Sequence, residues 1–439
     1  MRCGMGEADI TPKLGMEIPG DFDPCYGLAV YDPLFVKAAW FEDGDHRALI
    51  LGIDSVGMPK EDVASVRAAV AQQTGIDAKN IMVCCTHDHS AGPNTSTPMN
   101  ENDPVYFQIL LGGCVLAAQQ AKENCVEVRF VFGSTEVNHV SFNRRYWFKD
   151  GVVRTYPGIG NPQMVKAESG IDPELKALRV ETLDGRVIGM IINFACHVTA
   201  HIQAGPVPAF SGDYPGAISR RIKQAVGENV VSLFLTGCCG DVTQIDFEER
   251  LYPKSVQFGG NHHNFIGTIL AERALAAVKS GEAFSAGLRI QSVTVPLTRR
   301  MPTAEQYEAA KKYLADYPNP QTRDEFVDTY YANSAIILYE SGEIEDIELQ
   351  AIAFGDKVFV GFPAEMLHEL GMDLKDSVPE AKLFLSTLTN GEIGYIPTYR
   401  AFSHGGYEGK IGMTSRFVGG TGEKIIAAAA DLVRRIIME

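Results

Sequence analysis

The stretch of sequence that decides the fold spans residues 81–93, IMVCCTHDHSAGP, where an apolar run ends in polar side chains. The run 81–85 predicts a buried strand, and the small residues 90–93 then turn the chain. In α/β proteins, ligands usually bind at the carboxyl ends of strands. His87 and His89 point the same way if the chain is extended, so one imidazole could bind a metal while the other donates a hydrogen bond. The alternative is a pair of loop histidines without a ligand.

The composition is that of an ordinary globular protein, with 45% apolar and 21% charged residues among 439. The net charge of −16 argues against nucleic acid or an anionic membrane as the main partner, because both select basic surfaces. Nine cysteines without Cys-x-x-Cys spacing make a poor disulfide framework. The N-terminus lacks an apolar segment, and no apolar run approaches the roughly 20 residues of a membrane span. These features together predict a reduced, cytoplasmic enzyme or binding protein.

Strands and helices alternate along the chain. Strands are expected at 34–41, 48–53, 81–85, 126–132, 176–193 (a hairpin), 230–235, 288–297, 347–354, 357–362 and 383–389. Helices are expected at 60–73, 106–122, after 210–216, from His262-His263, at 303–313 after a capping box, at 325–340, around Glu365 and His368, and at 423–438. Residues 4–12, 143–173 and 390–409 are expected to be irregular. This pattern predicts an α/β fold, a mixed β-sheet core flanked by helices in a single large domain, 1–439.

Further polar residues have spacings that could serve a metal site. His197 and His201 are four residues apart, as in helical zinc sites, but Gly205-Pro206 follows so soon that His197 alone is the better candidate. Glu365 and His368 would share a helical face at i, i+3, a spacing used in carboxylate metal sites. A glutamate in the first turn of a helix is favoured by the helix dipole in any case, so the spacing alone does not favour a metal.

Other candidates have simpler explanations when each is taken alone. Tyr395 and Tyr407 are typical packing aromatics, and Asp241 and Thr243 are typical turn residues. His262-His263 stands where a helix begins, so capping is the simpler role. Spacing by itself therefore predicts a plausible metal site and no particular substrate.

Taken together and in order, these motifs resemble those of the neutral/alkaline (non-lysosomal) ceramidase family, zinc amidohydrolases that cut the N-acyl bond of ceramide. The matching segments extend over nearly the whole chain: ADITP (8–12), THDHSAGP (86–93, similar to THTHSGP with Asp for the second Thr and an inserted Ala), NR (143–144), FACH (194–197), SGDYPG (211–216), GDVT (240–243), FPAE (362–365), GYIPT (394–398) and YEG (407–409). Each motif is short, and their shared order carries the resemblance.

The resemblance implies a ligand set for zinc and a set of catalytic residues. The implied ligands are His87, His197, Glu365 and Tyr395. Zinc would acidify a bound water to a pKa of roughly 7 and polarise the scissile carbonyl. The implied catalytic residues are His89, Arg144 and Tyr407, which would orient the substrate and stabilise the oxyanion, and Asp241, which would organise a loop. Thr243 stands where ceramidases have Ser and adds a methyl group beside the zinc site.

Two departures shape the expected function. Family ceramidases are secreted or membrane-attached and carry a C-terminal immunoglobulin-like domain, whereas this sequence shows no signal segment and ends near the end of the catalytic domain. We therefore expect a zinc-dependent hydrolase of an amide bond in a small soluble substrate, without nucleic-acid or membrane partners and with homo-oligomerisation open. The alternative is a zinc-dependent epimerase, isomerase or lyase acting on a small polar carbonyl or sugar-derived compound. A non-catalytic metal-binding or ligand-binding protein is the third hypothesis.

Overall fold

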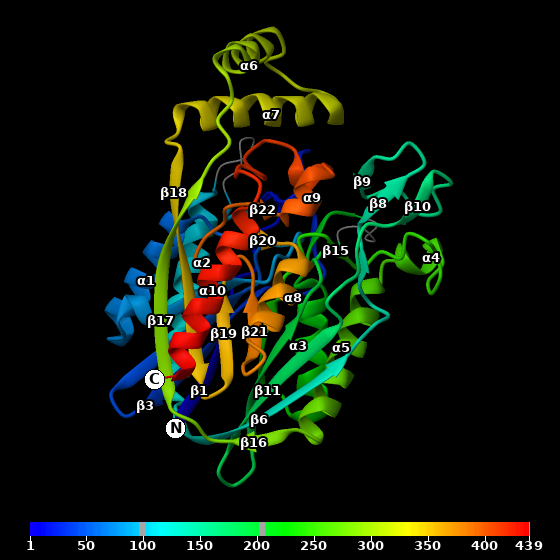
Figure 1. Cartoon of the computed structure of the whole chain (residues 1–439). Helices are drawn as coiled ribbons and strands as arrows, with labels where there is room; N and C mark the ends of the chain where they lie inside the picture. Colours follow the sequence, from blue (N-terminus) through cyan, green and yellow to red (C-terminus); the bar gives the residue numbers. More distant parts are fainter. Residues whose placement is uncertain (96–101, 202–206, 439) are drawn as a thin grey trace.

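A large mixed sheet forms the centre of the computed structural model, which describes residues 1–95, 102–201 and 207–438 (Figure 1). Within these residues the sheet has nine strands in the order β14-β12-β11-β6-β1-β3-β4-β5, with β16 beside β6. The strands are β14 (Val231–Thr236), β12 (Val187–Phe194), β11 (Glu174–Thr182), β6 (Val126–Glu136), β1 (Arg2–Asp9), β3 (Phe35–Asp43), β4 (His46–Ile53), β5 (Ile81–Cys85) and β16 (Glu282–Phe284). Pairs β12/β14 and β4/β5 are parallel and the others antiparallel. The predicted α/β class with a mixed sheet is confirmed.

A second sheet packs on one face of the first. It has the order β17-β18-β19-β21, formed by β17 (Leu288–Thr298), β18 (Ile344–Phe354), β19 (Lys357–Gly361) and β21 (Lys382–Ser386). Alternate residues of β4 show the packing: Ile50 lies in the core between the sheets with Phe359, whereas Leu49 and Leu51 face helices on the other side. Both faces of β4 are therefore buried, which explains its nearly continuous apolar sequence.

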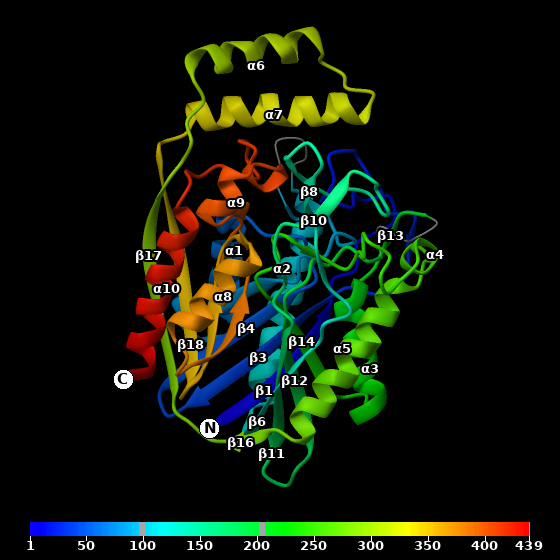
Figure 2. The same cartoon turned by 45° about the vertical axis from the view of Figure 1, so that its right-hand side comes forward.

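Helices cover the two outer faces, so the molecule has four layers, helices, sheet, sheet and helices (Figure 2). The first sheet is covered by α1 (Lys60–Thr74), α2 (Pro104–Glu123), α3 (Asp213–Val226) and α5 (His262–Lys279). The second is covered by α8 (His368–Ser377) and α10 (Thr421–Met438). No helix within the described ranges is long and apolar enough to cross a membrane.

The prediction of an irregular opening at residues 4–12 is wrong, because β1 pairs with β3 in the middle of the sheet. Its glycines hide the strand pattern, and packing explains them. A Cβ on Gly4 would lie 2.0 Å from the carbonyl oxygen of Ala121, and one on Gly6 would lie 2.3 Å from that of Ala117. Helix α2 therefore lies directly on this strand, at a distance that only glycine permits.

The loop expected at 143–173 also contains regular structure, a small sheet of order β10-β8-β9. Its strands are β8 (Arg145–Phe148), β9 (Val153–Thr155) and β10 (Met164–Ala167). The remaining short elements are β2 (Ala29–Val30), β7 (Phe142–Asn143), β13 (Ala209–Phe210), β15 (Val242–Thr243), β20 (Glu365–Met366), β22 (Tyr395–Ile396), α4 (Lys254–Gln257), α9 (Tyr399–Ser403) and the 3₁₀ turns η1 (Ala78–Asn80) and η2 (Tyr407–Gly409). Residues 390–409, expected as a loop, thus include β22, α9 and the whole of η2.

A helical hairpin rises from the second sheet, between β17 and β18 (Figure 1). It consists of α6 (Ala304–Asp316) and α7 (Arg323–Glu340), and the predicted capping box of Thr303 with Gln306 opens α6. Arg323 in the first turn of α7 forms ion pairs with Asp21 at 2.8 Å and Asp23 at 2.9 Å. The hairpin is thereby tied to the N-terminal loop.

Candidate metal centre

Two histidine-bearing loops are joined side by side where β5 and β12 end. The backbone nitrogen of His89 donates to the carbonyl oxygen of Val198, and Asp88 forms a β-bridge with the same residue. His87 adopts a left-handed conformation with φ 66°. The sequence predicted an extended chain at His87, and the left-handed backbone shows that this prediction is wrong. The two rings nevertheless meet, with their Nε2 atoms 3.3 Å apart.

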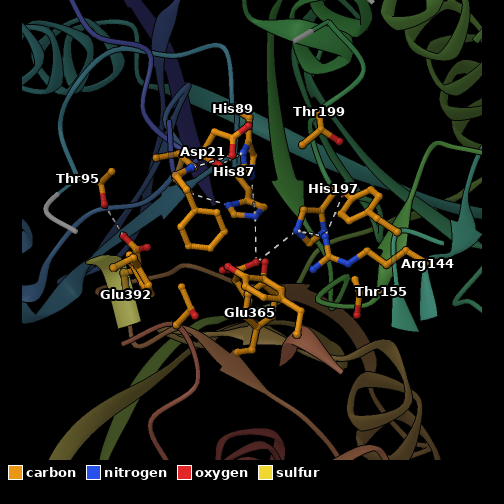
Figure 3. Close-up of a pocket in the computed structure, with 18 of the residues that line it drawn as sticks. Asp21, His87, His89, Thr95, Arg144, Thr155, His197, Thr199, Glu365 and Glu392 are labelled. Carbon is orange, nitrogen blue, oxygen red and sulfur yellow. Dashed lines mark hydrogen bonds and ion pairs between the residues drawn. The ribbon is translucent and has the colours of Figure 1, made fainter. Parts of the chain in front are cut away.

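Glu365 completes the convergence from the other side (Figure 3). Its Oε2 lies 3.1 Å from Nε2 of His87 and 3.3 Å from Nε2 of His197. It comes from β20, which follows β19 and pairs in parallel with β22, so that Glu365 stands beside Tyr395. The predicted helix around Glu365 and His368 is wrong, because Phe362-Pro363 leads into this strand and α8 begins only at His368.

The second nitrogen of each ring shows which way the imidazoles are oriented. Nδ1 of His87 is 2.8 Å from the carbonyl oxygen of Val56, and Nδ1 of His197 is 2.7 Å from that of Cys239. A carbonyl oxygen can only accept, so each Nδ1 carries the proton in the neutral ring and each Nε2 presents a lone pair. Burial and the nearby charge of Arg144 lower the pKa of His197 to about 3, so this ring is neutral.

Glu365 therefore faces two lone pairs with a carboxylate oxygen. Burial acts to raise the pKa of this buried carboxyl, but the charge of His87 and the hydrogen bonds with His197 and His87 hold the pKa of Glu365 well below its usual range. Although burial acts to lower it, the charge of Glu365 raises the pKa of His87, and Nη1 of Arg144 lies 3.1 Å from Nε2 of His197. A metal ion bound here would take the place of the proton on His87 and of the Arg144 contact. Ligand atoms that share one tetrahedral ion at roughly 2.0–2.1 Å stand about 3.3 Å apart, which matches both measured separations. The donor set fits a zinc ion.

His89 joins the same group by its ligand geometry. One nitrogen each from His87, His89 and His197 lies within 4.8 Å of the others. Nδ1 of His89 is 3.1 Å from the carbonyl oxygen of Gly20, so its Nε2 also faces the centre. A Cβ on Gly20 would lie 2.6 Å from this Nδ1, so the contact requires glycine. His89 is placed either to bind the metal or to contact a substrate on it.

Arg144 and two tyrosines stand on the opposite side of the centre. Nη1 of Arg144 lies 3.1 Å from Nε2 of His197 and 3.2 Å from the hydroxyl of Tyr156, and Nε donates to Glu408 at 3.1 Å. Its guanidinium lies 5.4 Å from the ring centre of Tyr395. The rings of Tyr395 and Tyr407 are 5.3 Å apart, edge to face. Burial, followed by the charge of Glu365, raises the pKa of Tyr395 well above its usual value.

Asp241 lies behind the centre and holds two other segments. Its Oδ1 accepts from the backbone nitrogen of His368 at 2.9 Å, and its Oδ2 accepts from Nδ1 of His368 at 2.8 Å and from Asn143 at 2.9 Å. His368 is thus directed to Asp241 rather than to the group around Glu365. Thr243, in β15, donates to Gln244 at 3.3 Å and is not among the described residues that line the cavity.

The remaining candidate histidines form a separate cluster. The rings of His201 and His263 lie 4.8 Å apart, and each packs on Tyr31. Asn261 is the N-cap of α5 and has no side-chain cap bond, so the expected capping role of His262 and His263 is not seen. Nε2 of His262 instead lies 3.4 Å from the carbonyl oxygen of Gln244.

A cavity of about 580 Å³ opens over the metal centre. Its rim contains side chains that the sequence analysis did not identify: Asp21, Phe22, Thr95, Tyr156, Arg323, Tyr330 and Glu392. Phe22 packs edge to face on Tyr330 of α7 at 5.0 Å and on Tyr407 at 6.2 Å. No local motif marks these residues, since their contacts join segments about 300 positions apart in the chain.

Comparison with known proteins gives one consistent result. No family model matches the sequence. Neutral ceramidase from Pseudomonas aeruginosa is 27% identical over 224 residues, which are 46% of this chain and 31% of the relative, so the match spans about a third of that protein. The crystal structure of neutral ceramidase from Pseudomonas aeruginosa superposes with a TM-score of 0.75 at 19% identity, over 100% of this chain and 75% of the other. A structure titled ceramidase complexed with C2 gives 0.76 at 18%, over 99% and 75%. The resemblance predicted from the motifs is thus confirmed: the chain has the fold of neutral ceramidase and is similar to it in sequence.

Proposed function

We propose that this chain is a zinc-dependent hydrolase that cleaves the amide bond of a small polar substrate, with residues 1–439 forming one catalytic unit. The observation that carries the proposal is the convergence of the buried Oε2 of Glu365 on Nε2 of His87 and Nε2 of His197, at separations that suit ligands of one ion. The fold of neutral ceramidase and the sequence similarity to it support the same chemistry.

Each residue of the centre has a definite part in such a reaction. His87, His197 and Glu365 would hold the metal, and the hydroxyl oxygen of Tyr395, which stands beside Glu365, would be the fourth ligand. The ion would acidify water and polarise the carbonyl oxygen. Arg144 places its positive charge next to the centre, where it can stabilise an oxyanion. Tyr407 has a high pKa and packs on Tyr395, so it keeps its proton and can donate it to the departing amine.

The lining of the cavity presents both polar groups and aromatic rings to a substrate. Val56 is the one aliphatic side chain among the described lining residues, and the others are charged, hydroxyl-bearing, imidazole, aromatic or glycine. The polar groups around the centre support a small polar substrate, while the aromatic rings provide apolar surface as well. Similarity to neutral ceramidase favours a second candidate, a ceramide-like lipid amide. Matched N-acyl amides with two to sixteen acyl carbons separate the two: a polar substrate predicts a rate that falls with chain length, and a lipid substrate predicts a rise.

The test of the metal centre combines metal content with turnover. Plasma mass spectrometry of tag-free protein should give about one zinc per chain in the wild type and almost none in Glu365→Ala or His197→Ala. His89→Ala then separates two roles. If His89 contacts substrate, this variant keeps its zinc and loses turnover, and if His89 is a ligand, it loses both. Retained zinc and turnover in His197→Ala would refute the site.

The reaction class is tested on the same preparations. Hydrolysis in H₂¹⁸O places the label in the carboxylate product and adds the mass of water to the substrate, whereas epimerisation adds no mass and elimination releases a fragment. Chelated protein, and chelated protein reloaded with zinc, are the controls. A wild type that stays metal-free and inert after zinc is added would contradict the proposal and favour a binding protein.

A further inference from the structure

A second carboxylate stands in the cavity wall on a fixed loop. Asn390 anchors the loop in a left-handed conformation, with φ 62°. Its backbone nitrogen donates to the carbonyl oxygen of Val83 at 2.8 Å, its side chain accepts from the nitrogen of Val83 at 2.9 Å, and its amide donates to Gln350 at 2.8 Å. Ile393 donates to the carbonyl oxygen of Pro363 at 2.7 Å. Glu392 lies between these anchors, so its backbone is tied to both sheets.

The side chain of Glu392 is directed into the cavity, on the side away from Arg144 (Figure 3). Its Oε2 accepts a hydrogen bond from the hydroxyl of Thr95 at 2.9 Å. A Cβ on Gly57 would lie 2.3 Å from the same oxygen, so the wall leaves room for the carboxylate only because residue 57 is glycine. Thr95 and Gly57, which lie on two different segments, therefore fix the position of this carboxylate.

Glu392 has no cationic partner among the described residues. The guanidinium of Arg416 is directed to Glu345, at 2.9 and 3.0 Å, and reaches only the backbone carbonyl of Glu392, at 3.4 Å. Arg323, on the cavity rim, forms ion pairs with Asp21 and Asp23. Burial raises the pKa of Glu392 and the charge of Glu365 raises it further, whereas the Thr95 hydrogen bond and the charges of His87 and Arg416 lower it. An unpaired carboxylate in such a cavity is costly unless a ligand supplies a positive charge.

The cavity is thus polarised across the metal centre. Glu365 has two imidazoles and the expected cation to balance its charge, and Arg144 stands beside His197. Glu392, which has no ion-pair partner in the described part of the chain, lies on the other side. A substrate whose carbonyl lies at the centre would meet a cation at one end and an anion at the other.

We propose that Glu392 is a specificity-determining residue that binds a positively charged amino group of the substrate, so that the substrate class is amides that also carry a free ammonium group. This inference rests on the proposed amide hydrolysis and refines its substrate. An ammonium group is favoured over a hydroxyl because a charged donor forms the stronger hydrogen bond with a carboxylate that has no ion-pair partner among the residues that the structure describes.

The test uses three N-acyl amides that differ only in one terminal group, ammonium, hydroxyl or methyl. Wild type should prefer the ammonium substrate, and Glu392→Gln should lower kcat/KM for it by on the order of 100-fold, since one partner of a desolvated charge pair is lost. The values of kcat/KM for the hydroxyl and methyl substrates should change by less than about threefold, because neither substrate has a charge that pairs with Glu392. Glu348→Gln is the matched control, because it removes an equal charge that is paired with Arg67 outside this cavity and should leave all three rates unchanged.

The outcomes separate this inference from the proposed function. Equal loss on all three substrates in Glu392→Gln, or a wild type that prefers the methyl substrate, would overturn the inference while amide hydrolysis stands. If the wild type hydrolyses none of them, the proposed function fails. Calorimetric binding of the same compounds then decides the inference: weaker binding of the ammonium compound alone to Glu392→Gln supports it, and unchanged binding overturns it.

Discussion

The buried pair of Asp241 and His368 permits a quantitative prediction. Asp241 accepts two hydrogen bonds from His368, from its backbone nitrogen and from Nδ1, and a third from Asn143. Both side chains are almost fully buried, with 1% of Asp241 and 5% of His368 exposed. In Asp241→Asn, an amide NH₂ would face the donors of His368 and Asn143, leaving the imidazolium without a counter-charge.

The expected loss is large, because breaking a buried ion pair by removing one partner costs about 3–5 kcal/mol. Against a typical total stability of about 5–15 kcal/mol, such a loss is readily measured by urea unfolding. His368→Gln removes the other partner, and the double variant should lose less than the sum of the two. The difference, the coupling energy, is expected to reach about 1.5–3 kcal/mol, the usual value of hydrogen bonds to charged groups.

The pH dependence of this loss follows from the two pKa shifts. Burial opposes both shifts, but the charge of Asp241 raises the pKa of His368, and the charge of His368 lowers that of Asp241. The contribution of His368 is complete below its unfolded pKa of about 6.5 and is lost as pH rises through the folded value. The contribution of Asp241 is present above its unfolded pKa of about 3.9 and is lost as pH falls through the folded value. The pair therefore stabilises most between these two unfolded values.

The assay is urea unfolding of zinc-free protein with chelator present, followed by circular dichroism at pH 5.5 and at pH 9. The cost of Asp241→Asn should be larger at pH 5.5, where His368 is charged in both states. His368→Gln should remove this difference between the two pH values. Equal costs at both pH values, or a double variant whose loss equals the sum of the single losses, would refute the assignment of an ion pair.

Two further predictions concern packing and the helical hairpin. Gly112→Ala should stabilise the protein by about 0.5–1 kcal/mol, because Gly112 is an exposed helix residue with no neighbour within 4 Å and alanine has the higher helix propensity. Gly113→Ala should destabilise the protein by at least about 1–3 kcal/mol, because its Cβ would lie 2.3 Å from Ile10. Urea unfolding of the two variants should give changes of opposite sign. Arg323→Ala should cost less than about 1 kcal/mol despite two ion pairs, because both are exposed, and a loss above about 2 kcal/mol would show that the hairpin depends on this contact.

The sequence predicted the strands whose residues alternate between two apolar environments. The pair β3 and β4 was expected at 34–41 and 48–53 and lies at Phe35–Asp43 and His46–Ile53. β1 was missed because its two glycines look like turn residues. Glycine is needed at both positions because they contact residues of helix α2 more than 100 positions further along the chain. A pattern within one strand cannot report a neighbour that distant.

The candidate site was predictable in the same uneven way. His87 and His89 stand in one short stretch, so their proximity followed from the chain alone, although the left-handed backbone at His87 did not. Glu365 and Tyr395 depended on the resemblance, because the sequence suggested a helix at Glu365 and a loop at Tyr395, where β20 and β22 in fact pair. Glu392 was not identified at all, since its only local signal is a charged residue between two glycines.

The position of the centre explains why its parts lie so far apart in the chain. His87 and His197 follow strands β5 and β12 of the first sheet, whereas Glu365 follows β19 of the second. The three meet only where the two sheets pack face to face, so their spacing depends on the core between the sheets rather than on any one loop. A cation that binds all three would join the two sheets beyond the carboxyl ends of these strands, which links metal binding to the stability of the core between the sheets.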